Sequence, residues 1–223
     1  MAISLIRRIF SKRTIKYIEF DLLRFKARHF GSRSKIMHDK LHLGCWNRKV
    51  SGWLNVDVKN SDYDMDLGCG ILPLPTNHFK FIVSQQVIEH LELFDELIPL
   101  FKECYRVLRE GGEIWLSCPD MERVCGDYIK DKGVALIEDK KTRVPGYYSF
   151  VQAPPQHAIN ELFHQDGEHK NLFDFELLEW TLKRAGFTVV KKANESLLLQ
   201  RFPEFPQRLD DYQALYVCAI KTK

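Results

Sequence analysis

Four short apolar segments near the start of the chain each end on a residue that could contact a nucleoside. The four end residues are, in chain order, Gly44, Asp57, Asp66 and Gln85. If the segments are parallel strands, their carboxyl ends share one edge of a sheet, which is where such sheets bind ligands. A glycine allows close approach to the backbone, and the two acids can accept hydrogen bonds from ribose hydroxyls and an adenine amino group. The set predicts a crevice for adenosine that needs no metal ion.

The turn after Gly44 argues against a dinucleotide. It reads Gly44-Cys45-Trp46-Asn47-Arg48 and lacks the second and third glycines of GxGxxG, so a pyrophosphate would have no cradle. A further glycine pair, Gly68 and Gly70, is followed by two prolines within residues 71–75, and these prevent a phosphate-binding helix from starting there. A nicotinamide-dependent oxidoreductase is therefore a disfavoured alternative.

Glu89 and His90 follow the fourth segment directly and are candidates for a general base beside the reacting atoms. The alternative is structural, with Glu89 as an acid at a helix N-terminus and His90 as a packing residue.

A long stretch over residues 133–165 reads as irregular and is expected to form a lid or a substrate wall. His164, with His157 and His169, adds further base candidates. No two of these histidines stand at helix-face spacing with a carboxylate, so no metal site is expected. Residues 197–207 are a second candidate for the substrate side.

Strand and helix patterns alternate from residue 40 onward, which predicts a doubly wound α/β sheet with mainly parallel strands. The strands are expected at residues 41–43, 53–56, 63–65, 79–84, 113–118, 187–191 and 215–220, and the helices at 93–108 and 173–185.

The first 35 residues form a separate basic segment. They carry ten Lys or Arg residues and two acids, while the whole chain has a net charge of only +3, so the remainder is acidic. An acidic body is a poor partner for nucleic acid, and none is expected. Apolar residues recur at helical spacing over residues 2–30. Such a helix could pack on its own domain or lie on an anionic membrane surface as a peripheral contact.

The six cysteines are scattered and form no CxxC pair, which favours free thiols in a reducing, cytoplasmic setting. The apolar runs are too short to span a bilayer.

Several motifs occur together in an order that resembles a known family. They lie at residues 41–45, 52–57, 72–79, 87–91, 106–112 and 118–120, with weaker similarity over 160–192. In this order and spacing they resemble class I S-adenosylmethionine-dependent methyltransferases of the methyltransferase-11 type. The resemblance implies a Rossmann-like, seven-stranded sheet whose last strand is antiparallel.

The resemblance also implies S-adenosylmethionine as the cofactor and a small-molecule or glycan acceptor, which could be lipid-linked. The expected cofactor-binding residues are Gly44, Cys45, Trp46, Asp57, Asp66, Leu67 and Gln85. Two positions depart from the family pattern. Trp46 stands where a second glycine is usual, and Glu110 replaces a usual proline, which we expect to be harmless.

The expected organisation is a basic helical segment over residues 1–35 and a methyltransferase domain over 36–223, with the lid-like insertion around 133–165. Because Trp46 alters the pocket and no base is obvious, a module that binds the cofactor without transferring a methyl group remains an alternative. The pattern does not predict an oligomeric state.

Overall fold

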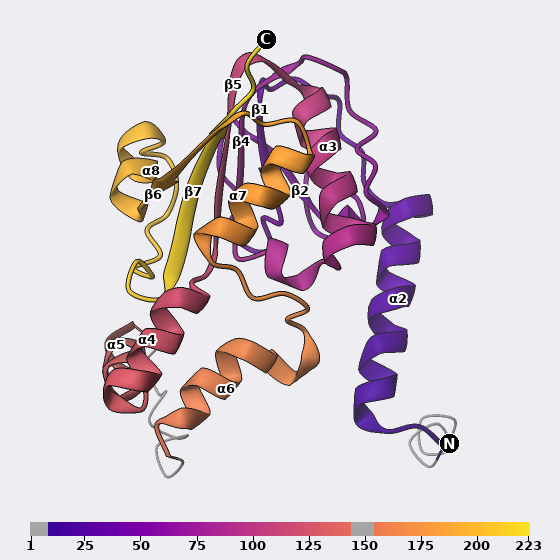
Figure 1. Cartoon of the computed structure of the whole chain (residues 1–223). Helices are drawn as coiled ribbons and strands as arrows, with labels where there is room; N and C mark the ends of the chain where they lie inside the picture. Colours follow the sequence, from indigo (N-terminus) through magenta and orange to yellow (C-terminus); the bar gives the residue numbers. More distant parts are fainter. Residues whose placement is uncertain (1–8, 144–153) are drawn as a thin grey trace.

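The structure is a computed structural model of the chain, and it describes residues 9–143 and 154–223. Seven strands form one sheet in the order β3-β2-β1-β4-β5-β7-β6 (Figure 1). Their bounds are β1 Lys40–Leu43, β2 Leu54–Asp57, β3 Tyr63–Asp64, β4 Phe79–Gln85, β5 Leu108–Pro119, β6 Val189–Ala193 and β7 Ala214–Ile220.

The sheet has one reversed strand. β7 runs antiparallel to both of its neighbours, β5 and β6, while the pairs formed by β1, β2, β3, β4 and β5 are parallel. The strand order turns around at β1, which pairs with β2 on one side and β4 on the other. A reversal of this kind opens a crevice at the carboxyl ends of the strands. The sequence-based prediction of a Rossmann-like sheet with an antiparallel last strand is confirmed.

Alternate side chains of the strands build two cores. On β4, Ile82 belongs to the core under α3 (Ile98–Val107) and α7 (Phe175–Arg184), whereas its neighbour Val83 belongs to the core beside α8 (Glu195–Arg201). This is the two-residue period of a strand that is buried on both faces. The helix expected at residues 93–108 begins with a wider π turn, Leu93–Leu97.

Most of the described part of residues 133–165 is helical, so the interpretation of this stretch as irregular was wrong. After α4 (Met121–Asp131), the chain forms α5 (Val134–Arg143) and α6 (Gln156–His164). The three helices share a small apolar core of Val124, Leu136, Ala158, Ile159 and Leu162. They lie below the carboxyl edge of the sheet in Figure 1. A role as a lid stays a prediction.

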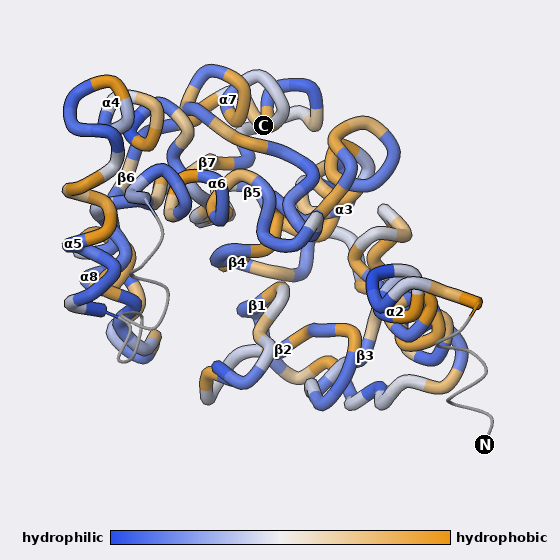
Figure 2. The backbone as a smooth tube through the Cα atoms, turned by 90° about the horizontal axis from the view of Figure 1, so that it is seen from below, coloured by the Kyte–Doolittle hydropathy of each residue, from blue (hydrophilic) through white to orange (hydrophobic). Residues whose placement is uncertain are grey.

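The basic N-terminal segment forms α2 (Lys12–Phe30), and charged contacts hold it against the rest of the chain. Arg24 donates hydrogen bonds to Asp66 at 2.9 Å and to Glu96 at 2.7 Å, and the Nε of Arg28 donates to Asp66 at 2.7 Å. Lys16 forms an ion pair with Glu168. These contacts favour the alternative in which the helix packs on its own domain. In Figure 2, α2 stands on one side of the ends of β1, β2 and β4, and α4 and α5 stand on the other.

The described part of α2 buries one side chain, Ala27, and leaves large apolar side chains exposed, among them Ile18, Leu22 and Phe25. Within residues 9–143 and 154–223, the helices are too short or too polar to cross a membrane. Peripheral membrane contact through residues 1–30 stays a prediction, and residues 1–8 of that segment lie outside the described residues.

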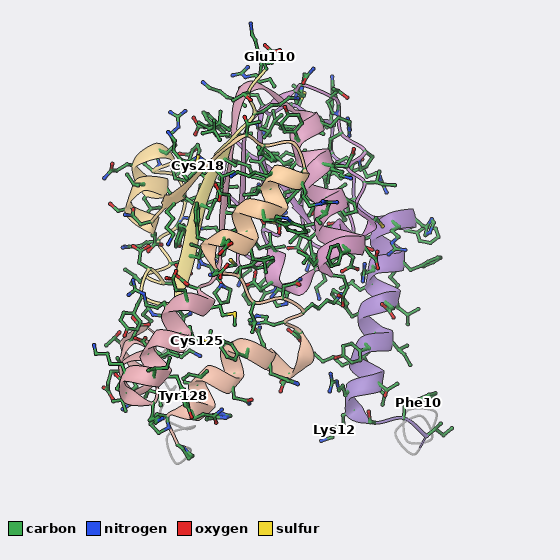
Figure 3. The ribbon with its side chains drawn as sticks, viewed as in Figure 1. Phe10, Lys12, Glu110, Cys125, Tyr128 and Cys218 are labelled. Atoms are coloured by element: carbon green, nitrogen blue, oxygen red, sulfur yellow. The ribbon has the colours of Figure 1, made fainter. Side chains whose placement is uncertain are left out.

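All six cysteines are free, as expected. Glu110, the replacement for proline, is exposed at the end of the sheet opposite to Cys125 and Tyr128 of α4 (Figure 3). It lies far from the crevice, in keeping with a harmless departure from the family pattern.

We predict that Asp66→Asn lowers the free energy of unfolding by about 2 kcal/mol, because it leaves the half-buried guanidinium of Arg24 without its carboxylate partner. Burial alone would raise the pKa of Asp66, but hydrogen bonds from Arg24 and Arg28 outweigh burial and lower it. A carboxyl group with a lowered pKa in the folded state stabilises above its unfolded pKa of about 4 and loses that contribution as pH falls.

Urea unfolding at pH 7 and pH 3 measures this effect. The difference between wild type and Asp66→Asn should shrink at pH 3, and Glu19→Gln, which changes an exposed acid of α2, should behave as wild type. A difference that is unchanged between the two pH values would contradict the ion-pair assignment.

Candidate active site

A cavity of about 520 Å³ opens at the carboxyl ends of β1, β2 and β4. Asp57 and Gln85, the last residues of β2 and β4, line it, as do Gly44, Cys45 and Trp46 from the turn after β1. The volume lies within the range that small-molecule sites usually have. The structure therefore brings five of the seven predicted cofactor-binding residues to one cavity.

Asp57 organises the turn after β1. One of its carboxylate oxygens accepts a hydrogen bond from the backbone N–H of Trp46 at 2.7 Å, and the other accepts from Val58 at 2.7 Å. Each oxygen keeps a further lone pair, so the carboxylate can still accept from hydroxyl groups in the cavity.

Gly44 has a positive φ of 68°, and a Cβ at this position would lie 2.2 Å from the side chain of Val87. The glycine is required by this close packing as well as by its backbone conformation. Trp46 also has a positive φ, 41°, which explains why a glycine is usual here, and its side chain is 70% exposed.

A second cavity of about 290 Å³ adjoins the first. Residues that line both cavities are Arg48, Gln86, His90, Gln165 and Arg208, and residues that line the smaller one alone are Glu89, Arg143, Asp210 and Gln213. Two ligands bound in these cavities would therefore meet at a shared wall.

Glu89 is the most deeply buried acid of the smaller cavity, with an exposed fraction of 1%. Its Oε2 atom has no hydrogen-bond partner among the described residues. Burial raises the pKa of Glu89 to about 8. Burial also lowers the pKa of His90 and that of His169, whose rings meet edge to face with centroids 4.8 Å apart.

Arg48 lines both cavities, and its described hydrogen bonds go to carbonyl oxygens rather than to a carboxylate. Its guanidinium donates to the carbonyl oxygens of Pro206 at 2.8 Å and Gln207 at 3.1 Å. In the described part of the chain it forms no ion pair. Burial and the nearby charge of Arg208 lower the pKa of Arg48.

Residues 47–116 match the model of a family described as a methyltransferase domain. The order of the seven strands and the antiparallel β7 are those of the Rossmann-like methyltransferase fold. No curated protein matches the chain at a significant level.

Solved structures of methyltransferases are similar to this chain at low sequence identity. A putative methyltransferase of Haloferax volcanii, in complex with the activator Trm112, is 12% identical with a TM-score of 0.50, and the match covers 96% of this chain and 95% of that one. An S-adenosylmethionine-dependent methyltransferase of Archaeoglobus fulgidus is 15% identical with a TM-score of 0.47, over 99% of both chains.

Phosphoethanolamine N-methyltransferase 2 of Haemonchus contortus, in complex with S-adenosyl-L-methionine, is 14% identical with a TM-score of 0.42. That match covers 92% of this chain and 53% of the Haemonchus contortus protein, so this chain spans about half the length of that protein.

Two residues expected at the cofactor lie outside the larger cavity. Asp66 is buried, and Arg24, Arg28 and the backbone N–H of Gly68 donate hydrogen bonds to its carboxylate. Leu67 belongs to the main apolar core. The geometry therefore corrects the expectation that Asp66 contacts adenine, because its carboxylate anchors α2 instead.

Of the residues predicted to be catalytic, some line a cavity and some do not. Glu89 and His90 line the smaller cavity, whereas His164 is exposed at the end of α6 and, like His157, lines neither cavity. His169, by contrast, lies beside His90.

Several residues of the larger cavity were missed by sequence reasoning. Phe20 and Leu23 come from α2, and Arg208 follows the segment 197–207, of which Phe205 and Pro206 also line the cavity. The sequence pattern indicated residues 197–207 only as a broad candidate for the substrate side, and α2 lies outside the motifs that carry the family resemblance.

We predict that the free energy of unfolding of Trp46→Gly is higher than that of Trp46→Ala by about 1 kcal/mol. The reason is that only glycine adopts the left-handed backbone at this turn without steric cost. Both variants remove the exposed indole, so the pair isolates the backbone effect. Chemical unfolding of the two variants measures it, and a Trp46→Ala protein at least as stable as Trp46→Gly would refute the left-handed turn.

Proposed function

We propose that the chain transfers a methyl group from S-adenosylmethionine to a small-molecule or glycan acceptor that carries an anionic group. The observation that carries this proposal is the wall shared by the two cavities. The larger cavity has the strand-end residues that suit a nucleoside, and the smaller one has arginines and polar side chains.

The residues of the larger cavity fit the cofactor. Asp57 offers carboxylate oxygens to ribose hydroxyls, and Gly44, Cys45, Trp46 and Gln85 supply the remaining contacts at the strand ends. The turn after β1 provides no phosphate cradle, in keeping with a ligand that has no phosphate. When bound, S-adenosylmethionine supplies an electrophilic methyl group on a sulfonium.

The chain's own contribution is to align the acceptor and to exclude water. Phe20, Leu23 and Phe205 give the larger cavity an apolar side. Glu89 and His90 stand at the smaller cavity and are the residues we propose to contact the reacting atoms. His164 lines neither cavity, so we assign it no role in the reaction.

An anionic acceptor is favoured by the guanidinium groups that line the smaller cavity. Arg143 and Arg208 are paired with Asp139 and Asp210, respectively, whereas Arg48 bonds only to carbonyl oxygens. A guanidinium binds carboxylate and phosphate groups through paired hydrogen bonds. We therefore assign Arg48 to an anionic group of the acceptor. A lipid-linked acceptor stays a prediction that depends on α2.

We predict that S-adenosylmethionine and S-adenosylhomocysteine raise the melting temperature and that NAD does not, because binding to the native state alone stabilises it. Asp57→Asn should weaken S-adenosylhomocysteine binding about 10- to 100-fold, since it removes a charged acceptor of hydroxyl hydrogen bonds. Asp39→Asn, at the other end of β1, is the matched control. Equal affinities for the two variants would overturn the assignment of the larger cavity.

The acceptor assignment is tested with methyl-labelled cofactor on matched pairs of sugars and small metabolites, one member with a carboxylate or phosphate and one without. We predict product from the anionic member and a kcat/KM about 10- to 100-fold lower in Arg48→Gln, with unchanged affinity for S-adenosylhomocysteine. An equal loss of affinity for S-adenosylhomocysteine would instead place Arg48 at the cofactor. If no acceptor in a broad panel is methylated although the cofactor binds, the non-catalytic binding module is favoured.

A further inference from the structure

Three side chains of types that can bind metal ions converge beside the smaller cavity. Glu89 and His90 lie in the turn after β4, and His169 lies in the segment after α6, far away in the sequence. One potential ligand atom from each of the three side chains lies within 4.8 Å of the other two. Sequence spacing gave no reason to expect this site, because it depends on a long-range contact.

Backbone hydrogen bonds fix the two segments against each other. The carbonyl oxygen of Glu89 accepts from the N–H groups of Lys170 at 2.8 Å and Asn171 at 3.2 Å. The side-chain amide of Asn171 donates to the carbonyl oxygen of Leu91. His169 is therefore held beside the turn after β4 by its immediate neighbours in the chain.

Both imidazoles have the outer hydrogen bond that metal-binding histidines usually have. Nδ1 of His90 bonds to the carbonyl oxygen of Glu168 at 3.2 Å, and Nδ1 of His169 bonds to the carbonyl oxygen of Leu162. A carbonyl oxygen can only accept, so Nδ1 carries the proton in each ring and Nε2 keeps its lone pair. A backbone carbonyl on the second nitrogen is the common outer contact of a ligating histidine.

The third group is a carboxyl with an unused oxygen. Glu89 is almost completely buried, and its Oε2 has no hydrogen-bond partner among the described residues. A buried polar atom without a partner costs stability, so such atoms in a folded protein call for an explanation. A bound cation would provide the missing partner.

We propose that Glu89, His90 and His169 bind a divalent transition-metal ion at the boundary of the two cavities. Two imidazoles and one carboxylate form a ligand set that suits manganese, iron, cobalt or zinc and leaves coordination positions open. Mg²⁺ and Ca²⁺, which prefer oxygen ligands, fit this set less well. Ligand atoms about 2.0–2.1 Å from a tetrahedral ion are about 3.4 Å apart, so binding would draw the three side chains closer together.

The location of the proposed metal site suggests a role in activating the acceptor. His90 lines both cavities, and Glu89 lines the smaller one. The open coordination positions are therefore available to an oxygen of the acceptor, and a divalent ion lowers the pKa of a hydroxyl that it binds. This use rests on the proposed function, whereas metal binding itself does not.

The test is calorimetric titration of Co²⁺ into the full-length, tag-free protein after treatment with a chelator, with no cofactor or acceptor present. We expect one saturable site, with a cobalt absorption spectrum that shows nitrogen ligation. His169→Ala and Glu89→Gln should each lower the Co²⁺ affinity at least about tenfold. His164→Ala, an exposed histidine of α6, should keep the wild-type affinity.

Circular dichroism establishes that each variant is folded, and His90→Ala replaces Glu89→Gln if burial of the amide prevents folding. The proposal is overturned if the wild type shows no saturable site, if folded His169→Ala binds Co²⁺ as tightly as wild type, or if Mg²⁺ binds more tightly than Co²⁺. None of these results affects S-adenosylhomocysteine binding, so failure of the metal site and failure of the proposed function are distinguished.

Discussion

The parallel pairing of β1 with β2 and β4 is the constraint from which the site follows. Leu43 pairs with Val56 on one side and with Ser84 on the other, so the residues that come next along the three strands leave the sheet at the same level. Gly44, Asp57 and Gln85 therefore line one cavity. The pairing depends on apolar strands that are buried on both faces, and the polar groups of the site occupy the one edge where burial ends.

Contacts between distant segments complete what the sheet begins. The ion pairs of Arg24 and Arg28 with Asp66 hold α2 where Phe20 and Leu23 reach the cavity. In the same way, the hydrogen bonds from residues 170 and 171 to Glu89 place His169 beside His90. Each connection consists of a few polar contacts, so the loss of either would change the shape of the site.

Sequence patterns predicted the features that depend on neighbours along the chain. The positions of Gly44, Asp57 and Gln85 at strand ends could be predicted because apolar runs of the sequence end there. The antiparallel β7 was implied by the family resemblance. Asp66 also ends a strand-like run, and nothing in its surroundings revealed that Arg24 and Arg28 would occupy its carboxylate.

The sequence pattern also failed to indicate helix α6, because its apolar residues pack on α4 and α5 rather than on the main core. The convergence of His169 with Glu89 depends on backbone hydrogen bonds that no spacing rule contains. Residues whose partners lie far away in the sequence are those that sequence reasoning misplaced or missed.

The central claim is that the edge formed by β1, β2 and β4 holds the cofactor. A crystal structure of the complex with S-adenosylhomocysteine tests it most directly. The account predicts the adenosyl group in the cavity lined by Gly44, Asp57 and Gln85, with the ribose hydroxyls on Asp57 and the ion pairs of Asp66 intact. A ligand bound elsewhere, or one whose adenine displaces Arg24 from Asp66, would contradict it.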